Sequence, residues 1–138
     1  MTLSYDSVNV GDALPEFESP KISRLVLALF CGASGDHNPM HVDSDFAKSF
    51  GMPDVFAHGM LSMAYLGRLL THWVPQSQLR SWNVRFLSMT PVNATIVCTG
   101  KIVGKSDADG ERRVTLEINA HTTDGQHTLS GEAVAALP

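Results

Sequence analysis

Hydrophobic and polar residues alternate along the second half of the chain. The alternation is clearest in residues 113–121, where every second residue from Val114 to Ala120 is apolar and the residues between them are polar. A period of two predicts a strand with one buried face. Similar but less regular patterns predict further strands at residues 94–103, 127–137, 81–89 and 16–19. Residues 106–110 and the Asp124-Gly125 pair suit hairpin turns, so most of these about five strands are expected to be consecutive and antiparallel.

The first half of the chain carries helical patterns instead. Residues 59–73 are apolar nearly all round, which predicts a helix enclosed by other parts of the protein. Shorter helices are expected at residues 24–31, where Ser23 is a suitable N-cap, and at residues 43–50. The predicted fold class is therefore α+β. Residues 1–138 are expected to form a single domain, in which a curved antiparallel β-sheet wraps around one long buried helix.

Composition and charge argue against several classes of protein. The net charge is −4, from 10 basic and 14 acidic residues, whereas nucleic-acid binding needs a cationic surface. No apolar run approaches the ~20 residues of a membrane span, and residues 1–6 lack the basic and apolar segments of a secretory signal. Cys31 and Cys98 are expected to be buried free thiols, and a cytoplasmic location fits them best.

The segment that carries candidate chemistry lies between the first two predicted helices. Asp36 and His41 stand five positions apart on a loop that bends at Asn38 and Pro39. Such a bend can bring a carboxylate and an imidazole to one point, where they could hold and activate a water molecule. The alternative is an Asx turn, in which Asp36 or Asn38 only caps its own backbone.

A second candidate segment begins the long helix. His58 and Gly59 stand where a helix start offers free backbone N–H groups and the positive end of its dipole. Such a place suits a carbonyl oxygen that becomes negative during a reaction. The alternatives are a packing glycine and a partly buried capping histidine.

A metal site is not expected, although the chain has six histidines. His37 and His41 have the spacing of a helical pair of ligands, but Pro39 lies between them and disfavours a helix there.

The pattern Ser34-Gly35-Asp36-x-Asn38-Pro39-x-His41, followed by His58-Gly59-Met60, resembles the MaoC-like dehydratase and (R)-specific enoyl-CoA hydratase family. The resemblance extends over nearly the whole chain, including the segments around Arg85 and Gly131. It implies the hot-dog fold and the reversible hydration of trans-2-enoyl thioesters to (R)-3-hydroxyacyl thioesters.

The resemblance also implies roles for individual residues. Asp36 and His41 would be the catalytic pair that holds the water, and the backbone N–H of Gly59 would polarise the thioester carbonyl. The residues expected to contact the substrate or shape its site are Asn38, His58, Met60 and Ser62. One departure is Gly67, which stands near the place where some hydratases carry a serine that supports the aspartate.

The resemblance implies no cofactor, because coenzyme A or acyl carrier protein forms part of the acyl-CoA or acyl-ACP substrate. The expected assembly is a homodimer, or a heterodimer with a related hot-dog subunit. A group of basic residues could bind the phosphates of coenzyme A, or it could be a solvated strand edge. It consists of Lys101, Lys105, Arg112 and Arg113. The alternative functions are a non-catalytic subunit of a heteromeric dehydratase and a hot-dog thioesterase.

Overall fold

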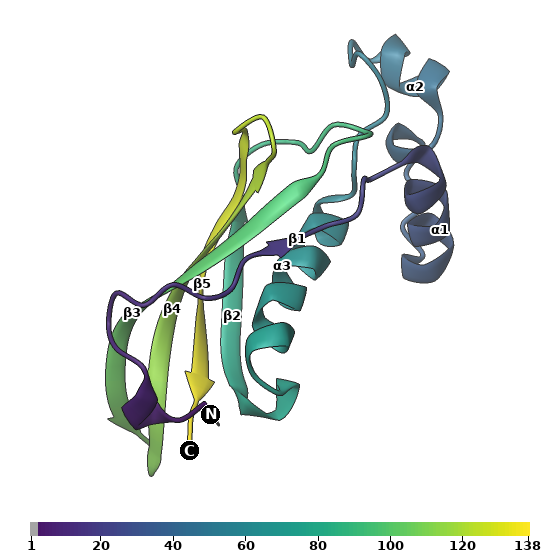
Figure 1. The fold of residues 1–138 in the computed structure, drawn as a ribbon. Coiled ribbons are helices and arrows are strands. Elements are labelled where there is room, and N and C mark those ends of the chain that lie inside the picture. The colour runs from purple at the N-terminus through teal and green to yellow at the C-terminus, as the bar shows by residue number, and fades with distance from the viewer. Residues whose placement is uncertain (1–2) are drawn as a thin grey trace.

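The computed structural model describes residues 3–138, so the first two residues of the segment considered for a secretory signal lie outside the described part. Five strands form one antiparallel sheet in the order β1-β3-β4-β5-β2 (Figure 1). The strands are β1 (Phe17–Glu18), β2 (Leu79–Phe86), β3 (Ile96–Ala108), β4 (Glu111–Thr122) and β5 (His127–Ala136). The helices are α1 (Arg24–Ser34), α2 (Ser44–Ser49) and α3 (Gly59–Trp73), with short 3-10 helices η1 (Tyr5–Ser7), η2 (Pro39–His41) and η3 (Gln76–Gln78).

The hairpin between β3 and β4 is longer and tighter than the alternation indicated. The two strands stay paired as far as Ala108 and Glu111, so the loop predicted at 106–110 shrinks to a two-residue turn. Asp109 and Gly110 in this turn have φ values of 52° and 75°, the left-handed conformation of a tight hairpin.

Strand β2 ends at Phe86, earlier than the predicted boundary at residue 89. Residues 87–95 form a loop, in which the Ser88 hydroxyl donates to the His127 carbonyl over 2.7 Å. This side-chain bond takes the place of a ladder bond, and the loop that results forms part of the site described below.

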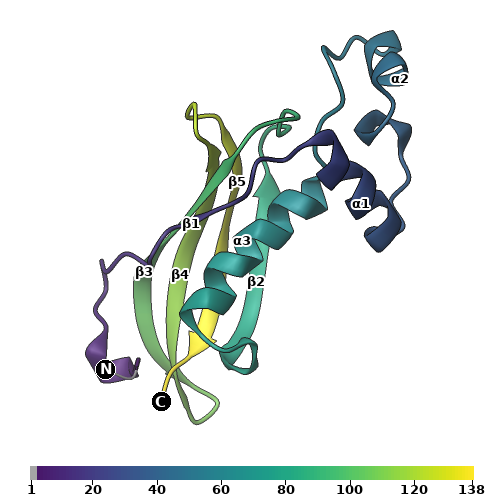
Figure 2. The same cartoon turned by 45° about the vertical axis from the view of Figure 1, so that its right-hand side comes forward.

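The long helix α3 lies across one face of the sheet (Figure 2). Leu61, Leu66, Leu69 and Leu70 are buried on the side that contributes to the core. The predicted arrangement of a long helix on a curved sheet is confirmed, with one difference. The opposite side of α3 is uncovered, and Met60 is 57% exposed, because the five-stranded sheet does not close around the helix.

The smaller helices α1 and α2 project beyond the sheet near the start of α3 (Figures 1 and 2). The Ser23 hydroxyl accepts a hydrogen bond from the Val26 N–H, which confirms the predicted N-cap of α1. The helix runs past Gly32 and ends only at Gly35, whose φ of 75° is the left-handed conformation of a C-cap. Asp43 caps α2 in the same manner, through the Phe46 N–H.

Both cysteines are buried and free, as expected. Burial raises the pKa of the Cys98 thiol to about 12, so this thiol is inert at neutral pH. Within residues 3–138, no helix combines the length and the apolar character needed to cross a membrane.

Candidate active site

The loop between α1 and α2 brings the side chains of Asp36 and His41 together. Asp36 Oδ2 lies 3.9 Å from His41 Nε2. Asn38 shapes the bend, because its Oδ1 accepts from the Met40 N–H over 3.1 Å while its own N–H donates to Asp36 Oδ1 over 3.2 Å. The Asx turns that were the alternative reading are therefore present, and they hold the pair in place. Asn38 itself acts on the loop, not on the cavity described below.

The orientation of the His41 ring is set by the Phe56 carbonyl. His41 Nδ1 lies 2.8 Å from this oxygen, which can only accept, so Nδ1 carries a proton and Nε2 faces Asp36. The His41 side chain is buried, whereas that of Asp36 is 49% exposed. A separation of 3.9 Å is too long for a direct hydrogen bond and leaves the two groups able to share a small polar molecule.

His58 lies beneath the pair and is only 1% exposed. Its ring stacks on that of His41, with the centroids 3.9 Å apart. Its Nε2 lies 3.3 Å from both the Asp36 carbonyl oxygen and Cys31 Sγ. Burial, and then the charge of His41, lower the pKa of His58, so its ring is neutral at pH 7. His58 therefore supports the pair from behind, and its place does not suit the substrate contact that was predicted.

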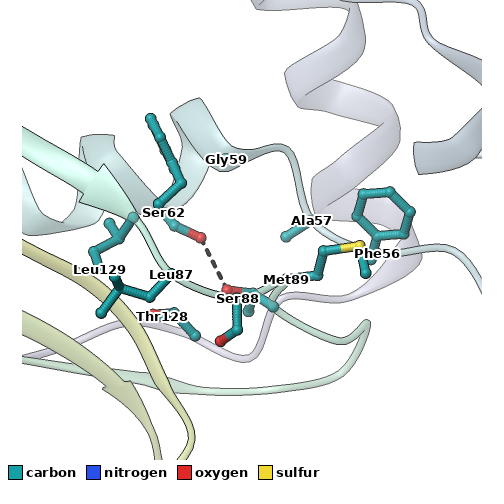
Figure 3. A pocket seen from close by; sticks show the side chains of 11 residues that line it. Phe56, Ala57, Gly59, Ser62, Leu87, Ser88, Met89, Thr128 and Leu129 are labelled. Atoms are coloured by element: carbon teal, nitrogen blue, oxygen red, sulfur yellow. Dashed lines mark hydrogen bonds between the residues drawn. The ribbon is translucent and has the colours of Figure 1, made fainter.

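The start of α3 opens on a cavity of about 420 Å³ (Figure 3). Its walls come from the first turn of α3, the end of β2 and the loop after it, and β5. The lining residues are Phe56, Ala57, Gly59, Ser62, Phe86, Leu87, Ser88, Met89, Thr90, Thr128 and Leu129. Of the predicted site residues, only Gly59 and Ser62 are among those that line this cavity. The residues outside its lining are Asp36, Asn38, His41, His58 and Met60.

The backbone N–H of Gly59 is free to bind a ligand, but there is little space for a side chain at this position. Among residues 3–138, no acceptor approaches the N–H groups of Gly59 and Met60. A side chain at Gly59 would meet the Phe86 ring, whose Cε1 lies 2.9 Å from the place of a Cβ. Any larger residue here would displace this ring, because the aromatic wall of the cavity approaches the helix backbone so closely.

Phe56 connects the pair to the cavity. Its carbonyl holds His41, its ring meets the His41 ring edge-on at 5.1 Å, and it lines the cavity. The loop before it is tied to α1 by an ion pair between Arg24 and Asp54. This guanidinium keeps the pKa of the Asp54 carboxyl well below its usual range.

Comparison with known proteins identifies the family and the fold. A model of the MaoC like domain matches residues 8–124. The chain belongs to the MaoC-like dehydratase family. Its fold is the hot-dog fold: the unliganded R-hydratase PhaJ1 from Pseudomonas aeruginosa superposes with a TM-score of 0.85 at 26% identity, covering 98% of this chain and 85% of that one.

Curated relatives of this MaoC-like chain include proteins of similar length and much longer ones. The (R)-specific enoyl-CoA hydratase of Rhodospirillum rubrum is 28% identical over 85% of this chain and 81% of its own length. The fatty acid synthase subunit beta of Saccharomyces cerevisiae is also 28% identical, over 79% of this chain. That match spans only 5% of the yeast subunit.

Two contributors to the MaoC-like site, Phe56 and Thr90, were not identified from the sequence. They meet through a bridge between Phe56 and Pro91 and a 2.9 Å hydrogen bond from the Ala57 N–H to the Thr90 carbonyl. No local pattern marks either residue, because both contacts join segments more than thirty positions apart. The one indirect signal was Pro91, which predicted the end of a strand.

The basic group considered for coenzyme A is largely engaged within the chain. Lys105 Nζ donates to the carbonyls of Tyr5 and Val8, over 2.7 and 2.8 Å. Arg112 pairs with Asp6, and Arg113 pairs with acidic residues of its own hairpin. Three of the four basic residues thus hold η1 and the β3–β4 hairpin, far from the start of α3 (Figure 1). A contact with coenzyme A phosphates, across a dimer, stays a prediction.

Asp36, His41 and His58 each place one potential metal-ligand atom within 4.8 Å of the others. The donor set of two imidazoles and a carboxylate is chemically suitable for a transition metal. However, His58 Nε2 is turned toward the Asp36 carbonyl and the Cys31 sulfur. The absence of a metal therefore stays a prediction, and a chelation test is given below.

Gly67, the departure noted in the sequence, lies against Trp82. A Cβ at Gly67 would lie 3.1 Å from Cη2 of Trp82, so a side chain there would need the indole to shift by a few tenths of an ångström. Support for Asp36 comes from its own loop, through the Asn38 N–H described above.

Proposed function

We propose that this protein catalyses the reversible hydration of trans-2-enoyl thioesters to (R)-3-hydroxyacyl thioesters. The observation that carries the proposal is the pairing of Asp36 with His41, whose ring stacks on His58, the residue directly before the free N–H groups at the start of α3. The family and the similarity to named (R)-specific enoyl-CoA hydratases support it. The substrate would be carried on coenzyme A or on acyl carrier protein, and no further cofactor is needed.

In this mechanism, a substrate water binds between Asp36 and His41. The pair removes one proton from the water while its oxygen bonds to the β-carbon, and the π electrons move toward the thioester carbonyl. The Gly59 N–H stabilises the resulting enolate oxygen, and the pair returns a proton to the α-carbon. Acid–base groups of this kind contribute about 10²–10⁴-fold to a rate, and one oxyanion donor about 2.7–4 kcal/mol.

The proposed assembly is a homodimer or a heterodimer with a related hot-dog subunit. Strand β2 forms one edge of the sheet, and unpaired strand edges are normally covered in native proteins. Exposed apolar side chains gather at the end of this edge and at the start of α3, namely Met60, Phe86, Leu87 and Met89. A mass measurement of the native protein, alone and with candidate subunits, tests this part.

The activity is tested by the loss of enoyl absorbance when the purified assembly is mixed with crotonyl-CoA and longer enoyl-CoA substrates. Asp36→Asn and His41→Gln should each lower kcat by at least about 10²-fold, because each removes one proton-transfer group. Asp45→Asn and His37→Gln are matched controls, since both residues are exposed and lie outside the pair.

Three outcomes would contradict the proposal. Absence of turnover on every enoyl thioester, alone and with partner subunits, would refute it. Release of free thiol would indicate a thioesterase, and full activity of a complex that contains both variants would indicate a non-catalytic subunit. Dialysis against a chelator should leave kcat unchanged, and a loss that zinc restores would instead assign a metal to the Asp36, His41 and His58 group.

A further inference from the structure

Two buried hydroxyl groups meet in the wall of the cavity. Ser62 is 2% exposed and Thr90 is 3% exposed, and their oxygens lie 3.2 Å apart. Figure 3 draws this hydrogen bond as the dashed line that starts at Ser62. Both residues line the cavity, whose surface is otherwise mostly apolar. Ser62 comes from the first turns of α3, and Thr90 comes from the loop after β2.

One of the two hydroxyl protons of this pair has no acceptor within the pair. Two hydroxyls carry two O–H groups, and a single bond between them uses only one. Neither hydroxyl has another partner within residues 3–138. The second O–H therefore has nothing to donate to except a molecule inside the cavity, and a buried unsatisfied donor is costly unless it has such a partner.

The pair also lies beside the backbone N–H that the proposed mechanism uses. Ser62 follows Gly59 by three positions, so both lie on one face of α3. Side chains on a helix tilt toward its N-terminus, which carries the Ser62 hydroxyl over the turn that begins at Gly59. Thr90 is held against this turn, because its carbonyl accepts from the Ala57 N–H over 2.9 Å.

We propose that the spare O–H of the Ser62–Thr90 pair is a second donor to the thioester oxygen, beside the N–H of Gly59. This inference rests on the proposed function and assigns Thr90 a catalytic contact. As the enolate forms, either hydroxyl can turn its proton to the oxygen while the other supports it, and no proton leaves the pair.

The two-hydroxyl arrangement makes a distinctive prediction for variants. Ser62→Ala or Thr90→Val alone leaves one O–H, now free of its neighbour, so kcat should fall less than tenfold. The double variant has no hydroxyl donor left beside the Gly59 N–H, and kcat should fall by about 10²-fold, the lower end for an oxyanion donor. A purely structural hydrogen bond behaves differently, because either single change already removes it and the double change costs no more.

The experiment measures kcat and KM for crotonyl-CoA and records the absorbance of bound 2,4-hexadienoyl-CoA. Donors to the thioester oxygen polarise the dienoyl group and shift its absorbance to longer wavelength. The double variant should show a smaller shift than the wild type with little change in KM, because only the Gly59 N–H still donates, whereas hydroxyl-retaining Ser62→Thr should keep the full shift. Ser19→Ala is the matched control, since Ser19 is a buried serine outside the cavity whose hydroxyl donates to the Pro20 carbonyl.

The outcomes separate this inference from the proposed function. If the wild-type protein hydrates enoyl thioesters and the double variant keeps its kcat and its spectral shift, only this inference fails. If the wild-type protein has no activity on any enoyl thioester, the proposed function fails as well. Should the double variant not fold, Ser62→Cys combined with Thr90→Val provides the same test, because a thiol fills the space but donates weakly.

Discussion

The substitution Gly59→Ala tests whether the aromatic wall at the start of α3 positions the substrate. An alanine Cβ would lie 2.9 Å from Cε1 and 3.0 Å from Cδ1 of Phe86. Ordinary carbon contacts are about 3.5–4.0 Å, so the ring must move by roughly 0.6–1.1 Å. Phe86 is 54% exposed and can swing outward, which removes part of the cavity wall without disturbing the core.

The expected effects on stability and activity differ. Alanine keeps the backbone N–H, and the contact that it strains is with the far end of a movable side chain. The free energy of unfolding should therefore change by less than about 1 kcal/mol. A displacement of about 1 Å near reacting groups can cost about 10²-fold in rate, so kcat/KM should fall by about 10- to 100-fold.

The assay combines urea unfolding with hydration kinetics on crotonyl-CoA. Gly32→Ala is the matched control: Gly32 lies within α1, no atom lies within 4 Å of its Cβ position, and the change should stabilise the protein while leaving kcat/KM unaltered. An active Gly59→Ala variant with wild-type kcat/KM would refute the claim that this wall positions the thioester. An unfolded variant would refute the claim that the Phe86 ring can move.

Two further predictions concern stability. Gly131→Ala should lower the free energy of unfolding by about 3 kcal/mol or more, measured by urea unfolding, because its Cβ would lie 2.0 Å from the Asn83 carbonyl oxygen and force β5 from β2. Stability should also fall as the pH drops below about 6.5, because burial lowers the pKa values of His58 and His121 and the unfolded chain then binds protons more readily.

These predictions have their own controls. Gly104→Ala should cost much less than Gly131→Ala, since its nearest neighbour, Thr115 Cβ, lies at an ordinary 3.7 Å. An equal decrease in the free energy of unfolding in both variants would show that replacing a glycine destabilises the sheet in itself, without any effect of the close approach of β2. For the pH effect, urea midpoints between pH 7.5 and 5.5 should fall less steeply in a His58→Gln variant than in the wild type. A wild-type midpoint that stays constant over this range would contradict the assignment.

Much of the fold could be predicted because its elements carry local periodic signals. The alternation around Val114 and the apolar run that begins at Gly59 each identify one element without knowledge of its neighbours. The ends of elements were predicted less accurately where strand pairing or a helix cap determines them. β3 continues to Ala108 because its partner strand accompanies it to the turn, and α1 continues past Gly32 because only Gly35 adopts the left-handed cap.

The candidate site likewise has a part that the sequence predicts and a part that only the tertiary structure shows. The bend at Asn38 and Pro39 is local chemistry, so the approach of Asp36 to His41 could be predicted from one short segment. The placement of His58 beneath His41 and of Thr90 beside Ser62 could not, because each contact joins segments that only the packed chain brings together. Substrate contacts were thus predicted for His58 and Met60. His58 is buried behind the Asp36–His41 pair, and Met60 lies outside the cavity.

By itself, the sequence determined the types of element, their order, the loop that carries Asp36 and His41, and the absence of long apolar runs. Tertiary structure alone decided which side of α3 meets the sheet, which hydroxyls face the cavity and which basic residues are engaged in ion pairs. The physical reason is that turns, caps and periodicity act over a few residues of chain. A cavity and its donors arise only where distant segments pack against each other.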